Sequence, residues 1–128
     1  MPQKVSWTVS VQVLGGPKIT ASDTMTVDAY DRLDVVVEAG AENKEVEVQP
    51  GAAGQVQFVS ISSSAYGPEL TYRVNSDTAN EVALDGQHVL IGSGAVGLLG
   101  AAPNTLYFSN DLTEDVSVTV LVARKATD

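Results

Sequence analysis

The sequence predicts an all-β protein, an antiparallel β-sandwich or jelly roll of about eight to ten short strands. Valine recurs at every second position from Val116 to Val122, the period at which a strand turns its side chains to one face. Similar alternating segments are separated by Gly, Pro, Asn and Asp turns, and no segment shows helical periodicity. Short strands with one apolar and one polar face favour two packed sheets over a parallel α/β sheet.

The first half of the chain is expected to form four strands. Residues 5–14 carry five apolar side chains in alternating register and end at a Gly-Gly-Pro turn. Residues 19–27 continue the alternation, and residues 31–38 place three apolar side chains on one face. Residues 45–49 form a short strand with charged side chains on its outer face, which Pro50 stops.

The second half is expected to complete the sheets. Residues 55–62 shift their apolar phase part-way, which a β-bulge or burial on both faces would produce. Residues 70–74 alternate cleanly. Residues 82–91 resemble a hairpin around an Asp-Gly pair, because this pair tolerates the positive φ of a tight turn. Residues 105–109 and 115–124 provide the last two strands.

Length and charge limit the domain count and the partners. The 128 residues are expected to form one domain, residues 1–128, which is long enough to bury a core without metals or disulfides. The formal net charge of −9 repels phosphate backbones and anionic lipids, so we expect no direct nucleic-acid partner and no membrane partner. No stretch has the form of a signal peptide or the ~20 apolar residues that span a bilayer, which indicates synthesis in the cytoplasm.

Reactive side chains are scarce, and we expect the protein not to be an enzyme. The chain has no cysteine and one histidine, His88, so it cannot build a zinc site from three or four Cys or His ligands. No Gly-x-Ser-x-Gly motif surrounds a serine, and a lone histidine in a strand is typical of a surface position. The sequence therefore predicts no catalytic residue and no cofactor.

Calcium needs only oxygen ligands, and three carboxylates lie near the start of the third expected strand. Asp28, Asp31 and Asp34 are the candidate ligands, although their spacing lacks the glycine and the bidentate glutamate of an EF-hand loop. The alternative is that they are solvated charges at a strand end. We follow this alternative and predict no bound metal.

Residues 92–102 break the alternating pattern, because they are small, apolar and uncharged. Exposure of Val96, Leu98 and Leu99 to water would favour aggregation of a monomer. The segment therefore either folds back over the end of the sandwich or packs against another subunit. We favour the subunit contact and name Val96, Leu98, Leu99 and, in the first strand, Trp7 as candidate interface residues.

The whole pattern resembles that of small all-β virion proteins of tailed bacteriophages, the capsid decoration or cement class. The resemblance lies in the short leader into residues 5–13, the Gly/Ala segment at residues 92–102 and the closing segments at residues 106–110 and 116–122. It implies a non-enzymatic structural protein that assembles in the host cytoplasm as a homo-oligomer, with a trimer favoured. It also implies docking on a capsid or another virion protein, and location in the virion. No functional residue is carried over, because no motif specific to that class is present.

The alternative function is a carbohydrate- or ligand-binding β-sandwich module, with calcium assistance as one form of it. Such a module would present aromatic rings, for example Tyr66, Tyr72 or Tyr107, on one exposed face or rim. Alternation instead groups Tyr72 with Leu70 and Val74, which are expected in the core. A hydrolase is the third hypothesis, and it would need a cleft that such short turns do not build.

Overall fold

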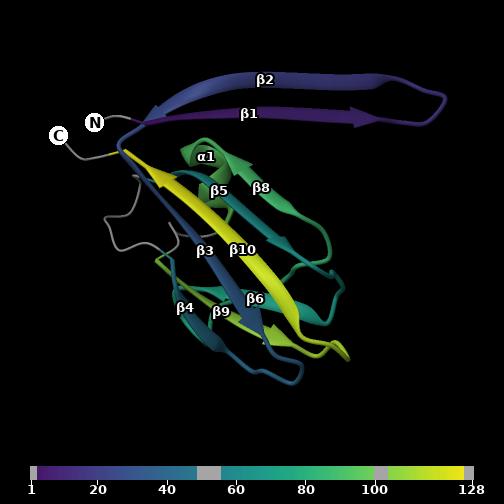
Figure 1. Cartoon of the computed structure of the whole chain (residues 1–128), viewed down its shortest axis with the longest axis vertical. Coiled ribbons are helices and arrows are strands. Elements are labelled where there is room, and N and C mark those ends of the chain that lie inside the picture. The colour runs from purple at the N-terminus through teal and green to yellow at the C-terminus, as the bar shows by residue number, and fades with distance from the viewer. Residues whose placement is uncertain (1–2, 49–55, 100–103, 126–128) are drawn as a thin grey trace.

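Two four-stranded antiparallel sheets pack face to face in the computed structural model, which describes residues 3–48, 56–99 and 104–125 (Figure 1). The first sheet has the order β3 (Ala29–Val37), β10 (Val116–Arg124), β5 (Val56–Ser63) and β8 (His88–Ile91). The second has the order β4 (Lys44–Glu47), β9 (Thr105–Asn110), β6 (Leu70–Val74) and β7 (Val82–Ala83). The predicted all-β antiparallel sandwich is therefore confirmed.

The core lies between these two sheets and depends on the register of the last strand. β10 pairs with β3 on one side and β5 on the other, so it is an interior strand of the first sheet. Its four alternating valines, Val116 to Val122, are all buried. They belong to the same apolar cluster as the fully buried Tyr72, Leu106 and Phe108 of the second sheet. Alternation in this strand thus produces one continuous core face.

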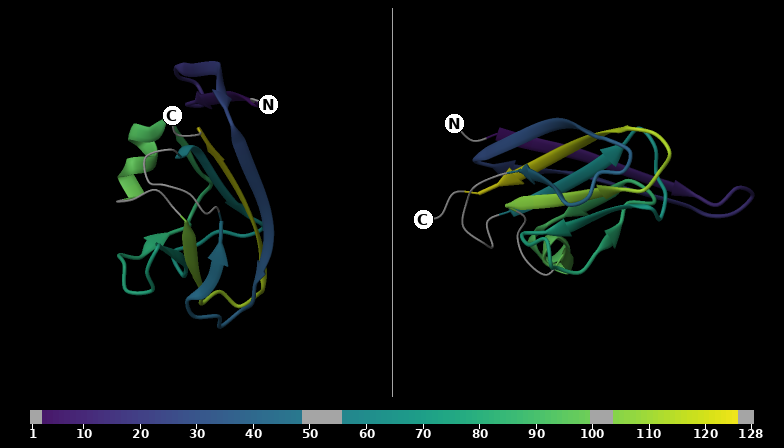
Figure 2. Two further views of the ribbon diagram at one scale, coloured as in Figure 1. Left: turned by 90° about the vertical axis from the view of Figure 1, so that its left-hand side faces the viewer. Right: turned by 90° about the horizontal axis from the view of Figure 1, so that it is seen from below.

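The first two strands leave the sandwich and form a separate two-stranded antiparallel sheet. We call residues 3–27, which contain β1 (Gln3–Gln12) and β2 (Lys18–Val27), the arm. The arm crosses one end of the sandwich, and its tip extends beyond the other strands in Figure 1 and in the right-hand view of Figure 2. β2 leads into β3 through Asp28 alone, whose backbone N–H donates to the Arg124 carbonyl at 2.9 Å.

The base of the arm is fixed to the outer face of the first sheet by a second apolar cluster. Val27, Phe58 and Ala123 are its buried members. Partly buried side chains from both the arm and the sheet pack against them: Val5, Trp7, Met25, Ile91 and Leu121. The arm is therefore attached at its base by apolar packing as well as by the chain itself.

The phase shift predicted in residues 55–62 has both of its proposed causes. The pairing of β10 with β5 is irregular between Ala123 and Arg124, because Ala123 pairs with Phe58 and Arg124 with Val56. Phe58 is buried under the arm, whereas Val59 faces the core between the sheets. β5 is consequently buried on both faces where the arm covers it. Burial on both faces explains why its apolar residues do not alternate with polar ones.

The prediction of a hairpin at residues 82–91 is wrong. β7 pairs with β6 in the second sheet, whereas β8 pairs with β5 in the first, so this segment crosses between the sheets. Leu84, directly after β7, is fully buried, and its N–H donates to the Leu70 carbonyl at 2.7 Å. Burial of Leu84 between the layers overrides the local tendency of Asp-Gly to form a tight turn.

Part of the uncharged segment at residues 92–102 is helical, which periodicity did not indicate. The helix α1 (Ser93–Val96) is followed by a 3-10 turn, η1 (Gly97–Leu99). It begins after Gly92, whose φ of 92° lies in the region that glycine adopts without strain. A helix of one turn is too short to show a repeat of apolar positions. Residues 100–102 lie outside the described residues.

Candidate docking surfaces

One face of the arm is mostly apolar, with Gln3 and Asp23 as polar members near its base and middle, and the other face is polar. In its antiparallel register Val5 pairs with Met25, and Val11 pairs with Ile19, so these apolar side chains share a face. The opposite face carries only polar and charged residues: Lys4, Ser6, Thr8, Ser10, Gln12, Lys18, Thr20, Ser22, Thr24 and Thr26. The apolar face is covered by the sandwich only near the base of the arm.

Farther along the arm, the same face is open to solvent. Exposed fractions rise from 37% at Val9 to 55% at Val11 and 61% at Val13, and Ile19 is 66% exposed. Monomeric proteins rarely expose contiguous apolar surface of this kind without a use for it. The distal apolar face of the arm is therefore the first candidate docking surface.

Trp7, a predicted interface residue, lies at the joint between the arm and the sandwich. It is partly buried against the cluster that contains Phe58 and Ala123. Part of its surface is therefore covered by its own chain and part remains exposed.

The other three predicted interface residues differ in their exposure to solvent. Val96 is 2% exposed and belongs to the sandwich core, so it has almost no surface to offer to a partner. Leu99 is partly buried and packs against that core. Leu98 is 81% exposed. The segment therefore folds back over the sandwich through Val96 and Leu99, and it leaves Leu98 open to a partner.

Leu98 lies at the wall of a hollow of about 550 Å³ with both polar and apolar lining, which we call the Leu98 pocket. Its lining comes from the end of β6, the following loop, β7 and η1: Val74, Thr78, Ala79, Asn80, Val82, Leu98 and Leu99. The loop that forms one wall also carries the acidic residues Asp77 and Glu81. This pocket is the second candidate docking surface.

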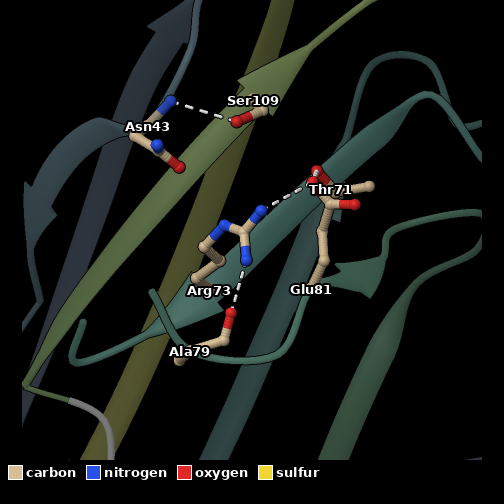
Figure 3. Close-up of polar contacts among 6 residues, drawn as sticks. All are labelled: Asn43, Thr71, Arg73, Ala79, Glu81 and Ser109. Carbon is tan, nitrogen blue, oxygen red and sulfur yellow. Dashed lines mark hydrogen bonds and ion pairs between the residues drawn. The ribbon is translucent and has the colours of Figure 1, made fainter. Parts of the chain in front are cut away.

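A polar cluster holds the loop that forms this wall (Figure 3). The Arg73 guanidinium donates to the Ala79 carbonyl and lies 3.4 Å from the Glu81 carboxylate. The Thr71 hydroxyl donates to the same carboxylate oxygen at 3.0 Å. These contacts fix residues 79–81 against β6 and so fix the shape of the Leu98 pocket.

Beside this cluster lies a smaller hollow of about 260 Å³ with three carboxylates and one guanidinium among its lining residues, Glu42, Asn43, Arg73, Glu81, Ser109 and Asp111. Asn43 donates its backbone N–H to the Ser109 hydroxyl at 3.0 Å, which closes one side (Figure 3). The single guanidinium is already bonded to Ala79 and Glu81. We assign this hollow a structural role.

His88 contacts Tyr72 and thereby connects the two sheets. The Tyr72 hydroxyl lies 2.8 Å from His88 Nδ1, and the ring centroids are 5.6 Å apart. Burial raises the pKa of Tyr72 to about 12, so its hydroxyl stays protonated at neutral pH. Tyr72 itself is fully buried. His88 is partly buried, so the pair is a partly buried contact between β6 and β8.

The three tyrosines considered for sugar binding do not share a face. The prediction that Tyr72 lies in the core is confirmed, since its exposed fraction is 0%. Tyr66 is 39% exposed and accepts the Ser63 N–H at 3.1 Å through its hydroxyl oxygen. Tyr107 is partly buried on β9, opposite Glu45. This arrangement offers no row of exposed rings to a sugar.

The candidate calcium ligands do not converge. Asp31 and Asp34 are three residues apart on β3, so their side chains leave opposite faces of the strand. The Asp34 carboxylate accepts the Thr119 hydroxyl at 2.7 Å and lies 3.7 Å from the Arg32 guanidinium. Asp28 precedes the strand at the bend below the arm. In the described ranges no three His, Cys, Asp or Glu side chains gather as a metal site would require.

The exposed tip of the arm and the Leu98 pocket are features that the sequence did not single out. Val13 and Leu14 lie directly before the Gly-Gly-Pro turn and could have predicted the exposed tip. Apolar residues beside a tight turn have few neighbours to bury them. The pocket combines residues about 25 positions apart, and nothing in their sequence pattern joins them.

Comparison with family models, curated proteins and solved structures found no match for this chain. Among the described residues, no helix combines the length and the apolar character needed to cross a membrane.

Proposed function

We propose that this protein is a non-enzymatic structural module that acts through contacts between its own copies and with a larger lattice, in the manner of a virion decoration or cement protein. The observation that carries this proposal is the arm, with its distal apolar face exposed beyond the sandwich. The partners would be further copies of the chain, with a trimer favoured, and a capsid or other virion protein. The location would be the virion.

The physical argument concerns the stability of the arm. An isolated two-stranded hairpin is marginal in water, because each strand has one neighbour and one face remains hydrated. Here the base is packed against Phe58, but Val11 and Ile19 have no such cover. Burial of the distal face against a partner would remove apolar surface from water and stabilise the extended arm. The exposed distal face of the arm therefore fits an assembly role better than the role of a soluble enzyme.

The strand order is compatible with the proposed function. The eight sandwich strands have the orders β3-β10-β5-β8 and β4-β9-β6-β7. We infer from these orders a jelly roll, the double-sheet fold of two Greek keys that occurs in viral capsid and lectin domains. Such a likeness of fold favours the structural and the sugar-binding hypotheses equally. We favour the structural hypothesis, because Tyr66, Tyr72 and Tyr107 do not form a row of exposed rings for a sugar.

The proposal is tested by the mass of the protein in solution. Light scattering after size-exclusion chromatography should show a homo-oligomer at micromolar concentration. Val11→Asp places a charge on the apolar face of the arm and should give a monomer whose far-ultraviolet circular dichroism is unchanged. Ser10→Asp, one position away on the polar face, is the matched control and should keep the oligomer. A wild-type protein that stays monomeric up to high micromolar concentration would refute the proposal.

A further inference from the structure

We infer that the tip of the arm docks in the Leu98 pocket of a second copy of this chain. The inference rests on the proposed function and adds which two surfaces meet. In the favoured trimer this contact is heterologous, because the tip of each copy meets the pocket of the next copy around the ring.

The tip has the shape of a small apolar projection. Leu14 is 93% exposed, the largest exposed fraction among the large apolar side chains, so it does not lie in the pocket of its own chain. The turn beneath it is closed by two backbone hydrogen bonds, from Gly16 to Val13 at 2.7 Å and from Val13 to Pro17 at 3.0 Å. Gly15 has a φ of 77°, which glycine adopts without steric cost. Leu14 is thus held outward on a closed turn.

The Leu98 pocket has the complementary character. Val74, Val82 and Leu99 supply apolar lining, and the exposed Leu98 stands at its wall. A volume of about 550 Å³ accommodates Leu14 together with a neighbouring side chain of the tip. Docking would therefore bury two of the most exposed leucines in the chain at the same contact.

Charge favours an arm-to-body contact over an arm-to-arm contact. The arm contains Lys4 and Lys18 against the single acidic residue Asp23, so its net charge is +1, and the rest of the chain therefore carries −10. Lys18 lies at the tip, beside Ile19, and the loop that walls the pocket carries the exposed Asp77. Opposite charges of this kind steer the tip toward that loop, whereas two arms repel each other weakly.

Buried area counts against an interface made by two arms alone. The exposed fractions of the distal arm side chains, Val9, Val11, Val13, Leu14 and Ile19, add up to about three fully exposed side chains. A fully buried side chain of this size removes roughly 60–120 Å² from water, so two arms packed together would bury about 400–700 Å² in total. A specific interface needs about 1,000 Å² or more. In a heterologous ring each copy gives its tip to one neighbour and receives the tip of the other, so each copy takes part in two contacts.

The chain contains no cysteine, so introduced cysteines test the contact directly. Leu14→Cys places a thiol at the tip, and Asn80→Cys places one at the pocket. The double variant, oxidised under mild conditions and separated on a non-reducing gel, should give covalent species up to the mass of the oligomer. Replacement of the tip thiol by one on the polar face, Ser10→Cys with Asn80→Cys, is the matched control and should give little cross-linking.

Each outcome separates this inference from the proposed function. If the single Leu14→Cys variant forms cross-links and the double variant forms none between Leu14→Cys and Asn80→Cys, the arms pack against each other. That result would overturn the inference. An oligomeric protein without any cross-link in the double variant would overturn it too, while the assembly function would stand. Only a monomeric wild-type protein would refute the function. Leu14→Ala should also weaken association about ten- to a hundredfold, the change expected for loss of one buried leucine side chain.

Discussion

Phe58→Ala should detach the arm while the sandwich stays folded. Phe58 is 6% exposed and is one of three buried residues in the cluster at the base of the arm. It does not belong to the core between the two sheets. Truncation of its ring therefore removes the surface on which Trp7 and Met25 pack, and it leaves the main core intact.

The magnitude follows from the size of that cluster. A Phe→Ala change in a core costs about 3–5 kcal/mol, and the cost falls where the surroundings can collapse into the cavity. The cluster is small and one of its walls is a movable arm, so we expect the lower end, about 3 kcal/mol. A loss of this size shifts the equilibrium between attached and detached arm roughly a hundredfold toward detachment.

Trp7 is the only tryptophan and reports the state of the arm without any label. In Phe58→Ala its emission should shift to the red, because water reaches the indole when the arm leaves the sheet. With increasing denaturant, the fluorescence transition should precede the loss of far-ultraviolet circular dichroism. The matched control is Phe108→Ala, which removes a fully buried ring from the other cluster. It should lower global stability and leave the native Trp7 emission as it is. An unchanged Trp7 spectrum in Phe58→Ala would refute this account of the joint.

Three further predictions concern the sandwich. Raising the pH from 10 to 12 should lower the melting temperature. The pKa of Tyr72 is raised from 10.0 to about 12 in the folded protein, so in that range its hydroxyl ionises only in the unfolded chain. Tyr72→Phe should remove this part of the decrease in melting temperature. A pH profile of melting that is identical in the variant would contradict this. Asn110→Leu should reduce the free energy of unfolding by about 3 kcal/mol in chemical denaturation, because the buried amide of Asn110 bonds three backbone groups that would lose their partner. Glu81→Gln should cost less than about 1 kcal/mol by the same measurement, since its ion pair with Arg73 is partly exposed, and a larger loss would show that the loop depends on this charge.

The strands of the sandwich were predictable because burial and alternation agree in them. Residues 70–74 and 116–122 alternate in the sequence and lie in the core with the expected phase. Residues 82–91 were not predictable in the same way, because the local Asp-Gly signal and the burial of Leu84 point to different structures. Tertiary burial decided the outcome, since the buried leucine side chain contributes more than the preference of a turn.

The candidate docking surfaces were only partly predictable. The uncharged segment predicts the same exposure for Leu98 and Val96. The structure shows that Leu98 is exposed and Val96 is buried. One helical turn separates their environments, and a turn of this length leaves no periodic signal. The pocket beside Leu98 depends on how the loop at residues 76–81 folds against β6, which the Arg73 contacts determine. Such contacts between distant polar side chains have no pattern in the sequence.

The first and the last strands have the same alternating pattern but differ in the burial of their apolar side chains. β10 has a hydrogen-bonded neighbour on each side and a second sheet across its apolar face, so Val118 and Val120 are buried in the chain itself. β1 has one neighbour and no opposing sheet beyond its base, so Val11 remains more than half exposed. Alternation therefore specifies which side of a strand is apolar, and the number of surrounding layers specifies what covers that side. Where the chain supplies no second layer, as along the distal arm, a neighbouring copy can supply it. The mass of the Val11→Asp variant, compared with that of Ser10→Asp, is therefore the measurement that most directly tests whether the exposed face of the arm serves the proposed assembly.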